Sequence, residues 1–215
     1  VGLVYKIPDN LSFHEAALVE PVACCLNGVE KAEIGIQDTV LVIGAGFMGL
    51  TCLELAKLKG ARVIVSDVID ERLEVAKSLG ADLVVNPRNE GLKDAISKFN
   101  NGEYADAVIC SVGGKIAFQQ GMEAMAVGAR LILLGGTYPP ANVEFDPNIV
   151  HYKQTKIIGS VSYTNKGFTN SIKLIANKKL STKVLQSELI GLEHLEDAFH
   201  DVLNAKGLRK CVVFK

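Results

Sequence analysis

Residues 39–49 are Thr-Val-Leu-Val-Ile-Gly-Ala-Gly-Phe-Met-Gly, a short β-branched run followed by a glycine-rich turn. The residues that follow, 47–59, have a helical pattern. Gly44 permits a tight turn, Gly46 lets the backbone approach a pyrophosphate, and Gly49 lets helix and strand pack closely. The whole turn consists of Gly44, Ala45, Gly46, Phe47, Met48 and Gly49. Because amides at a helix start attract anions, this turn predicts a site for dinucleotide phosphates; a glycine turn without a ligand is the alternative.

An acidic residue lies where the second half of such a site is expected. Asp67 follows the apolar run 62–66, roughly 20 residues beyond the glycine turn. A carboxylate there accepts hydrogen bonds from the adenosine ribose hydroxyls and repels a 2′-phosphate, and the next residue, Val68, adds no positive charge. These residues predict NAD rather than NADP; capping of the next helix is the alternative for Asp67. Arg72, one turn into that helix, would flank the adenosine or lie on a solvated face.

Short apolar runs alternate with helical patterns through the middle of the chain. The expected strands are Thr39–Ile43, Arg62–Ser66, Leu83–Val85, Ala107–Cys110, Arg130–Leu134 and Lys156–Val161. The expected helices are Phe47–Lys59, Asp70–Leu79, Glu90–Phe99 and Lys115–Ala126. Strands that are apolar throughout are covered on both faces, and their alternation with helices implies right-handed crossovers. The sequence therefore predicts an α/β fold with a doubly wound parallel sheet of the Rossmann type.

Small residues follow the fourth and fifth expected strands. Ser111, Val112, Leu134, Gly135 and Gly136 lie in these two turns. The carboxyl ends of strands form the ligand crevice of an open α/β sheet. We therefore expect these turns to let the nicotinamide half of the cofactor approach the backbone; ordinary turn residues are the alternative.

Both ends of the chain fall outside this alternation. Ser12 and Glu15 form a capping-box pattern, which opens a helix that is expected to pass Pro21 and continue to about Val29. Towards the other end we expect a strand over Val184–Leu192, a helix over Leu195–Leu203 and a strand over Cys211–Phe214. Because these strands have no place in a six-stranded sheet, we expect them to pair with strands that this chain lacks.

The composition excludes several classes of protein. The chain has 215 residues, 48% hydrophobic, with a net charge of −1, so disorder is excluded and no basic block points to nucleic acid or an anionic membrane. Dividing by about 150 residues per domain gives about 1.4 domains. The 5 cysteines include no C-x-x-C pair, and no leader or apolar run of about 18 residues is seen, so a reducing cytoplasm is expected. Residue 1 is Val rather than Met, which indicates a processed product or part of a longer protein.

A set of motifs beyond the glycine turn points to one family. Glu20-Pro21-Val22-Ala23, the turn Gly44–Gly49, Asp67 and the run Ala76-Lys77-Ser78-Leu79-Gly80-Ala81-Asp82 occur in this order. In this combination the chain resembles the medium-chain, zinc-dependent alcohol dehydrogenases, and within them most closely the polyol (sorbitol) and threonine dehydrogenases. The resemblance extends over essentially the whole chain.

The resemblance implies a two-domain enzyme of which this chain is a part. The family combines a GroES-like catalytic domain with a Rossmann cofactor domain. The implied division is a segment returning from the catalytic domain over 1–20, the dinucleotide-binding domain over 21–163, and a C-terminal helix and strands, partly of the catalytic domain, over 164–215. The N-terminal part, where the family has its cysteine and His-Glu zinc ligands, is missing.

Four residues gain a role only from the resemblance. It places Glu20 near the catalytic zinc, as a ligand or as the partner of zinc-bound water. A carboxylate inside an apolar helix beside a proline agrees with this, since a buried carboxylate needs a cation; an exposed Glu20 is the alternative. Val161 and Ser162 would lie against the pyrophosphate or nicotinamide, although polyol-type relatives often have Arg where Ser162 stands. Lys210 would reach the cofactor phosphates or is an ordinary strand-edge lysine.

The implied activity belongs to the intact protein. It would oxidise a secondary alcohol of a polyol or sugar derivative, with zinc binding the substrate oxygen and NAD accepting hydride. The isolated chain is expected to be inactive. Two alternatives are a stand-alone NAD-binding or sensing module and a zinc-free quinone-reductase-like oxidoreductase; Glu20-Pro21 and Asp67 argue against the second. The family often pairs through the sheet edge, so a homo-oligomer through Lys156–Val161, with Ile158 in the contact, is expected.

Three short patterns invite other interpretations. Tyr152 and Lys156 match the Y-x-x-x-K pair of short-chain dehydrogenases, but Lys156 opens a β-branched run, so the two should not share a helix face. Gly113-Gly114-Lys115 lacks the Ser or Thr of a P-loop. Cys110 ends an apolar strand and is expected to be a buried thiol rather than a nucleophile.

Overall fold

The computed structural model describes residues 4–186 and 188–214. Its main feature is a six-stranded sheet in the order β3-β2-β1-β4-β5-β6, in which every neighbouring pair is parallel. The strands are β1 Thr39–Ile43, β2 Arg62–Ser66, β3 Leu83–Val85, β4 Ala105–Cys110, β5 Met125–Leu133 and β6 Lys156–Gly159. This order has its switch point between β1 and β4, as in a doubly wound dinucleotide-binding sheet. The predicted fold class is confirmed.

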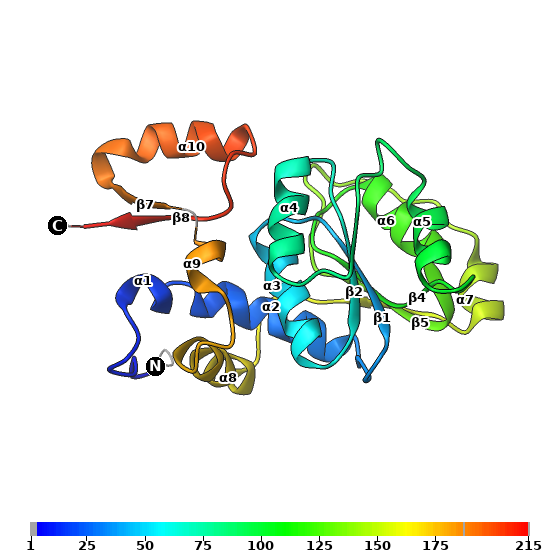
Figure 1. Cartoon of the computed structure of the whole chain (residues 1–215), viewed down its shortest axis with the longest axis horizontal. Helices are drawn as coiled ribbons and strands as arrows, with labels where there is room; N and C mark the ends of the chain where they lie inside the picture. Colours follow the sequence, from blue (N-terminus) through cyan, green and yellow to red (C-terminus); the bar gives the residue numbers. More distant parts are fainter. Residues whose placement is uncertain (1–3, 187, 215) are drawn as a thin grey trace.

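Helices cover both faces of this sheet (Figure 1). They are α1 Phe13–Ala16, α2 Val19–Lys31, α3 Phe47–Leu58, α4 Asp70–Ser78, α5 Leu92–Phe99, α6 Lys115–Glu123, α7 Pro147–Lys153, α8 Asn165–Ala176, α9 Thr182–Leu185 and α10 Leu195–Leu203. Among the residues described, none of these helices is both long and apolar enough to span a bilayer.

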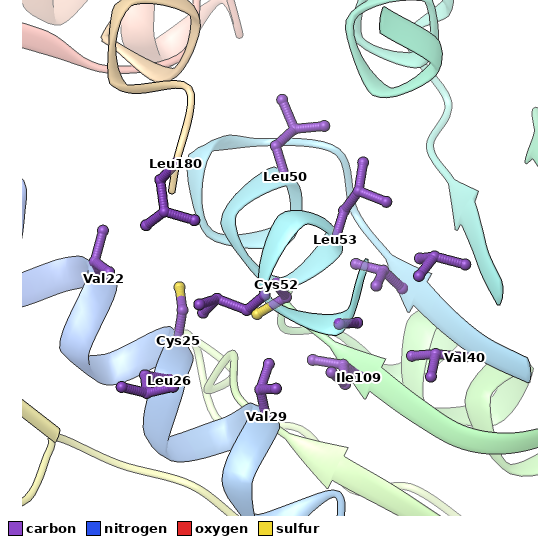
Figure 2. Packing of buried hydrophobic residues seen from close by; sticks show 14 of the residues in the cluster. Val22, Cys25, Leu26, Val29, Val40, Leu50, Cys52, Leu53, Ile109 and Leu180 are labelled. Carbon is purple, nitrogen blue, oxygen red and sulfur yellow. The ribbon is translucent and has the colours of Figure 1, made fainter. Parts of the chain in front are cut away.

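The strands are apolar throughout because each face has its own core. All five residues of β1 are buried. Val40 and Val42 join the core under α2, α3 and α4, whereas Leu41 and Ile43 join the core under α5 and α6. In Figure 2, the side chains of α2 and α3 meet over the sheet, with Val29 lying toward it. A strand buried on both faces shows no alternation, which is the pattern from which the parallel sheet was predicted.

Several expected elements begin or end at other residues than predicted; β5, for instance, begins at Met125 instead of Arg130. Three of the differences have a clear physical cause. The helix expected over Lys115–Ala126 ends at Glu123, because Met125 is already a strand residue that pairs with Ala105. The expected single N-terminal helix is two helices, α1 and α2, and Pro21 lies in the first turn of α2 instead of its middle. Proline is tolerated there because the first-turn amides have no partner within the helix.

The third difference concerns the strand expected over Val184–Leu192. Leu185 is buried and ends helix α9, and only β7, Glu188–Gly191, is strand; Ser187 lies outside the described residues. Leu192 opens a short 3₁₀ turn that leads into α10. Burial of the leucine in the main core outweighs the β propensity of its neighbours.

The C-terminal residues form a unit of their own. β7 pairs in parallel with β8, Lys210–Val213, and α10 connects the two strands. The expectation that these strands pair with strands outside the chain is wrong to this extent, since they pair with each other. Figure 1 shows this unit at the end of the molecule opposite α5, α6 and α7.

The division into segments 1–20, 21–163 and 164–215 stays a prediction, and residues 1–3 and 215 lie outside the described part. Leu18 from before the expected cofactor domain and Ile175 and Leu180 from after it are buried in the same core as α2 and α3. The described residues on both sides of each expected boundary therefore pack together.

The cysteines behave as expected from their apolar surroundings. All five are free thiols, and Cys25, Cys52 and Cys110 are buried. Burial raises the pKa of Cys110 to about 12, so it is no nucleophile near neutral pH, as predicted.

Glu15 connects α1 to the rest of the chain. Its carboxylate forms the predicted capping box with Ser12 and accepts hydrogen bonds from Lys178 at 2.7 Å and from Thr182 at 3.3 Å. The hydrogen bond with Lys178 is the main reason that the pKa of Glu15 falls from 4.5 to about 2.

We predict that Glu15→Gln lowers the free energy of unfolding at pH 7 by about 1 kcal/mol, because the ion pair is partly exposed. A carboxylate with a lowered pKa stabilises the fold above its ordinary pKa of 4.5, and this contribution is lost as the pH falls toward about 2. Urea titrations should therefore show a smaller difference in unfolding free energy between the unchanged chain and Glu15→Gln at pH 2.5 than at pH 7. Glu74→Gln is the control, since its ion pair with Lys77 is exposed on both sides. A pH-independent loss would contradict the assignment.

Candidate functional site

The turn between β1 and α3 is compact because three glycines meet there. Gly44 has a φ of +97°, and its N–H donates to the Ser66 carbonyl at 2.7 Å. A Cβ on Gly49 would lie 1.8 Å from the Gly44 carbonyl oxygen, so no larger residue fits. Gly46 precedes α3, and among the described residues no side chain caps this helix. The first amides of α3 therefore remain available to an anion.

Asp67 lies directly beside this turn, as predicted. One of its carboxylate oxygens accepts the N–H of Ala45 at 2.6 Å, and the other accepts the N–H of Ile69 at 2.9 Å. The helix α4 that follows begins at Asp70 with Ile69 as its cap residue, so Asp67 is not its N-cap. A carboxylate has about four acceptor positions, so Asp67 retains capacity for two further donors. Its contact with the Ala45 amide was not predicted from the sequence.

A cavity of about 530 Å³ opens at this point. Its size is in the usual range for small-molecule sites. It is lined by Ile43, Gly44, Ser66, Asp67, Val68, Ile69, Arg72, Pro87, Val112, Gly113, Gly114, Lys115, Ile116, Ala117 and Gln120. The structure thus brings the predicted Gly44, Asp67, Val68, Arg72 and Val112 to one hollow between the ends of β1, β2 and β4.

A larger hollow of about 620 Å³ lies elsewhere, between α1 and the C-terminal unit. Its charged lining is mostly acidic, with Glu188, Glu193, Asp197 and Asp201. An acidic surface repels phosphate groups, so the smaller cavity at the glycine turn is the better candidate for a dinucleotide.

The turn after β4 packs tightly against the glycine turn, and the turn after β5 packs against the turn after β4. Ser111 donates its hydroxyl to the Ile43 carbonyl at 2.9 Å, and a Cβ on Gly135 would lie 2.6 Å from the Val112 carbonyl carbon. A Cβ on Gly113 would lie 1.7 Å from the Gly136 carbonyl oxygen. Close backbone packing therefore requires Gly113 and Gly135, whereas Gly136 has open space around it. Their predicted role toward nicotinamide stays a prediction.

Arg72 and Arg209 connect the C-terminal unit to the glycine turn. Arg72 donates to the Ala205 carbonyl at 2.9 Å and also lines the cavity. The guanidinium of Arg209 lies 4.9 Å from the centre of the Phe47 ring, at the start of α3. Sequence reasoning missed Arg209 and chose its neighbour Lys210.

Lys210 points into the C-terminal unit. Its ammonium group donates to Asp201 at 2.7 Å and to Glu188 at 2.6 Å, and these hydrogen bonds raise its pKa. Arg209 lies in the loop just before β8, whereas Lys210 is the first residue of that strand. Two adjacent basic residues in the sequence were the available signal. The sequence does not show which of the two faces the glycine turn.

Glu20 is exposed, so the expectation of a buried carboxylate is wrong. It lies in the first turn of α2, where polar side chains reach solvent, and accepts a hydrogen bond from the Cys24 thiol at 3.4 Å. Burial, and then Glu20, raise the pKa of Cys24 to about 11. In residues 4–186 and 188–214, no three His, Cys, Asp or Glu side chains are grouped so that they could hold a metal ion. These residues alone do not fit a catalytic zinc site.

Val161 and Ser162 follow β6, which ends at Gly159, two residues earlier than expected. Val161 is exposed, and Ser162 has a left-handed φ of +58°. Both lie at the carboxyl edge of the sheet, next to the turn after β5, because the Ser160 N–H donates to the Leu133 carbonyl at 3.0 Å.

The structure excludes both the Y-x-x-x-K pair and the P-loop as catalytic motifs of the described residues. Tyr152 belongs to helix α7, whereas Lys156 is the first residue of β6. The pair therefore does not share a helix face, as predicted. Lys115 begins helix α6 without the upstream turn of a P-loop.

We predict that Gly49→Ala lowers the free energy of unfolding by about 3 kcal/mol, since the new methyl group meets a backbone carbonyl that cannot move aside. Gly136→Ala is the matched control, because a Cβ there meets no atom within 4 Å. Chemical denaturation of the two variants measures the difference. Equal stabilities would mean that the close packing of α3 against the turn is not needed.

Comparisons with known proteins agree with this geometry. Residues 48–177 match the family model described as zinc-binding dehydrogenase. The chain is 34% identical to an alcohol dehydrogenase of Geobacillus stearothermophilus over 94% of its length, and 31% identical to sorbitol dehydrogenase of Bos taurus over 95%. It spans 58% of the length of each of these relatives.

Solved structures show the same likeness. A zinc-binding dehydrogenase of Sinorhizobium meliloti 1021 bound to NADP superposes with a TM-score of 0.90 and 25% identity, covering 98% of this chain and 62% of that one. An alcohol dehydrogenase (rspB) of E. coli CFT073, complexed with NADH, gives a TM-score of 0.86 and 28% identity, again covering 98% and 62%.

Proposed function

This chain belongs to the zinc-binding dehydrogenase family of medium-chain alcohol dehydrogenases, and from that membership we propose that it is the NAD-binding portion of an alcohol or polyol dehydrogenase. The observation that supports this most directly is that the glycine turn, at Gly44, and Asp67 line one cavity, while the uncapped start of α3 follows in the same turn. These groups suit, in turn, the pyrophosphate and the adenosine ribose of a dinucleotide.

Space at Gly46 supports the phosphate end of the proposal. The nearest atom to a Cβ on this residue is the Arg72 guanidinium, 4.0 Å away. The fold itself therefore tolerates a side chain at Gly46, in contrast to Gly49. Open backbone before a helix start is what a closely bound pyrophosphate needs.

The preference for NAD over NADP rests on charge. Asp67 is almost fully buried, so its carboxylate would face a ribose 2′-phosphate with little screening. Val68 adds no compensating charge, and Arg72 already donates to the Ala205 carbonyl. Because relatives have been solved with NADP and with NADH, the family leaves the choice open and these residues favour NAD.

The reaction we propose for the whole protein is oxidation of a secondary alcohol of a polyol or sugar derivative. Bound NAD supplies the hydride acceptor, while the protein positions it. The described residues do not form a zinc site, so catalytic zinc would take most of its ligands from outside this chain, with Glu20 contributed from the exposed start of α2. We therefore expect the isolated chain to bind NAD without oxidising alcohols, in the cytoplasm, where free thiols persist.

The exposed C-terminal unit supports the idea of a missing domain. Parallel strands are normally covered on both faces, yet β7 and β8 form a two-stranded sheet at the end of the molecule. The side chains of Leu189, Phe199, Leu203 and Phe214 are exposed there. An apolar surface of this kind marks an interface. Since the relatives are longer than this chain, we propose that a further domain of the intact protein covers it.

A stand-alone NAD-binding module is the second candidate. It is favoured by one observation, namely that every group assigned to the dinucleotide lies within this chain. Alcohol oxidation by the full-length protein, with zinc detected in it, would favour the dehydrogenase.

We predict that the chain binds NADH at least tenfold more tightly than NADPH, which fluorescence titration can measure. Asp67→Asn removes the charge but keeps the shape of the side chain. It should weaken the binding of NADH about tenfold, the value of one charge-assisted hydrogen bond, and so reduce the difference between the affinities for NADH and NADPH. Gly46→Ala should abolish NADH binding without changing the melting temperature. Equal affinity of the unchanged chain for both cofactors would defeat the assignment of Asp67.

A homo-oligomer through the sheet edge remains a proposal. β6 is an edge strand of the sheet, as predicted. Ile157 is exposed on it, whereas Ile158, the residue expected in the contact, packs against the buried core, so that choice of residue was wrong. Pairing of two such edges would satisfy their free backbone groups.

We predict that Ile157→Lys shifts the chain toward monomer in sedimentation while leaving its stability nearly unchanged. Ile158→Lys is the contrasting variant and should lower stability, because it places a charge against the core. An unchanged sedimentation profile for Ile157→Lys would remove the edge contact from the proposal.

A further inference from the structure

The side-chain amide of Asn27 on α2 donates to three acceptors on the segment 160–162 that follows β6. The distances from its nitrogen are 3.3 Å to the Ser160 hydroxyl, 3.4 Å to the Val161 carbonyl and 3.0 Å to the Ser162 carbonyl. Asn27 is half-buried, and neither the glycine turn nor the core requires an amide at this position. One polar side chain thus fixes three consecutive residues of a loop more than 130 residues away in the sequence.

The segment that Asn27 contacts has an unusual backbone. Ser162 is held in the left-handed region, at a φ of +58°, which a residue with a side chain adopts only when its surroundings favour it. Val161 beside it presents an exposed apolar side chain at the carboxyl edge of the sheet. Without the amide, this conformation would have fewer contacts to maintain it.

The position of the segment relates it to one end of the dinucleotide. Asp67 assigns the adenosine to the end of β2, on one side of the switch point between β1 and β4. A dinucleotide lies across that switch point, so its other half extends over the carboxyl ends of β4, β5 and β6. Ser160 is hydrogen-bonded to β5 at Leu133, which places 160–162 on that side.

We propose that Asn27 is a positioning residue for the nicotinamide half of the cofactor. It acts by holding Val161 and Ser162 in the conformation that receives the ring. This inference rests on the proposed function, since it assigns a further residue to the same site. A loop that is ordered before binding loses less conformational entropy when the ligand arrives, so the amide contributes affinity without touching the ligand.

A second α2 side chain provides a matched control. Lys31 lies one helical turn beyond Asn27 on the same face and donates to the Gly159 carbonyl at 2.8 Å. Its contact is to the last residue of β6, which the sheet already holds through its pairing with Leu133. Lys31→Met therefore removes a contact between α2 and the same region without affecting 160–162.

The test uses the full chain and two probes. NADH contains the nicotinamide, whereas ADP-ribose contains only the adenosine, the pyrophosphate and a ribose. Asn27→Asp keeps the shape of the side chain but replaces the donor by a carboxylate. We expect it to weaken the binding of NADH about tenfold, while the affinity for ADP-ribose changes less than twofold. Asn27→Ala, which adds no charge, should show the same split if Asn27→Asp fails to fold. Lys31→Met should leave both affinities unchanged.

Three outcomes would overturn the inference. Unchanged NADH affinity in both Asn27 variants would show that the amide does not act on the nicotinamide half. An equal loss for NADH and ADP-ribose would show a general structural role instead. If the unchanged chain binds neither probe, the proposed dinucleotide site itself fails, and that result is distinguishable because it appears without any substitution.

Discussion

The close approach of α3 to the turn after β1 is the constraint on which the rest of the site depends. Gly49 lies so near the Gly44 carbonyl that even a methyl group is excluded. Only in this arrangement does the start of α3 point over the end of β1, at the switch point of the sheet. The turn after β4 closes against the same place through the Ser111 hydroxyl. The uncapped start of α3 and the cavity beside the turn, which the proposed dinucleotide would use, both depend on this backbone contact.

Asp67 shows how one side chain serves both the fold and the site. It ties the end of β2 to the glycine turn through the Ala45 amide and still has acceptor positions directed at the cavity. Asp82, the last residue of the run by which the family was recognised, has a structural role. It accepts the Val63 amide at 2.6 Å and pairs with Lys57 at 2.7 Å. The run 76–82 by which the family was recognised therefore includes a residue that stabilises the packing of β2, α3 and the turn before β3.

Helix α2 connects the parts of the molecule that the proposed reaction needs together. Its apolar face packs on α3 and the sheet, as Figure 2 shows for Cys25, beside Cys52 of α3, and for Val29, beside Ile109 of β4. Its first turn presents Glu20 to solvent, and its polar face fixes the loop after β6 through Asn27. The helix therefore joins the proposed zinc side of the intact enzyme to the proposed nicotinamide side.

The sequence by itself determined the sheet, the glycine turn and the position of Asp67, because each depends on residues close together in the chain. Burial on both faces leaves strands without alternation, and a Gly-x-Gly-x-x-Gly pattern between such a strand and a helix indicates a tight turn. Strands β1, β2 and β3 have the predicted bounds for this reason. The family resemblance then predicted membership of the zinc-dependent alcohol dehydrogenases, which the matching family model confirms.

Only the tertiary structure decided which side chains face the site across long sequence distances. Arg209 lies over the Phe47 ring, whereas Lys210 is held by Glu188 and Asp201, and no local pattern shows this difference. The exposure of Glu20 depends on where α2 begins, and the contact of Asn27 with Ser162 depends on how α2 packs beside β6. Local propensity sets where elements form, whereas burial and packing between distant segments set which of their side chains meet.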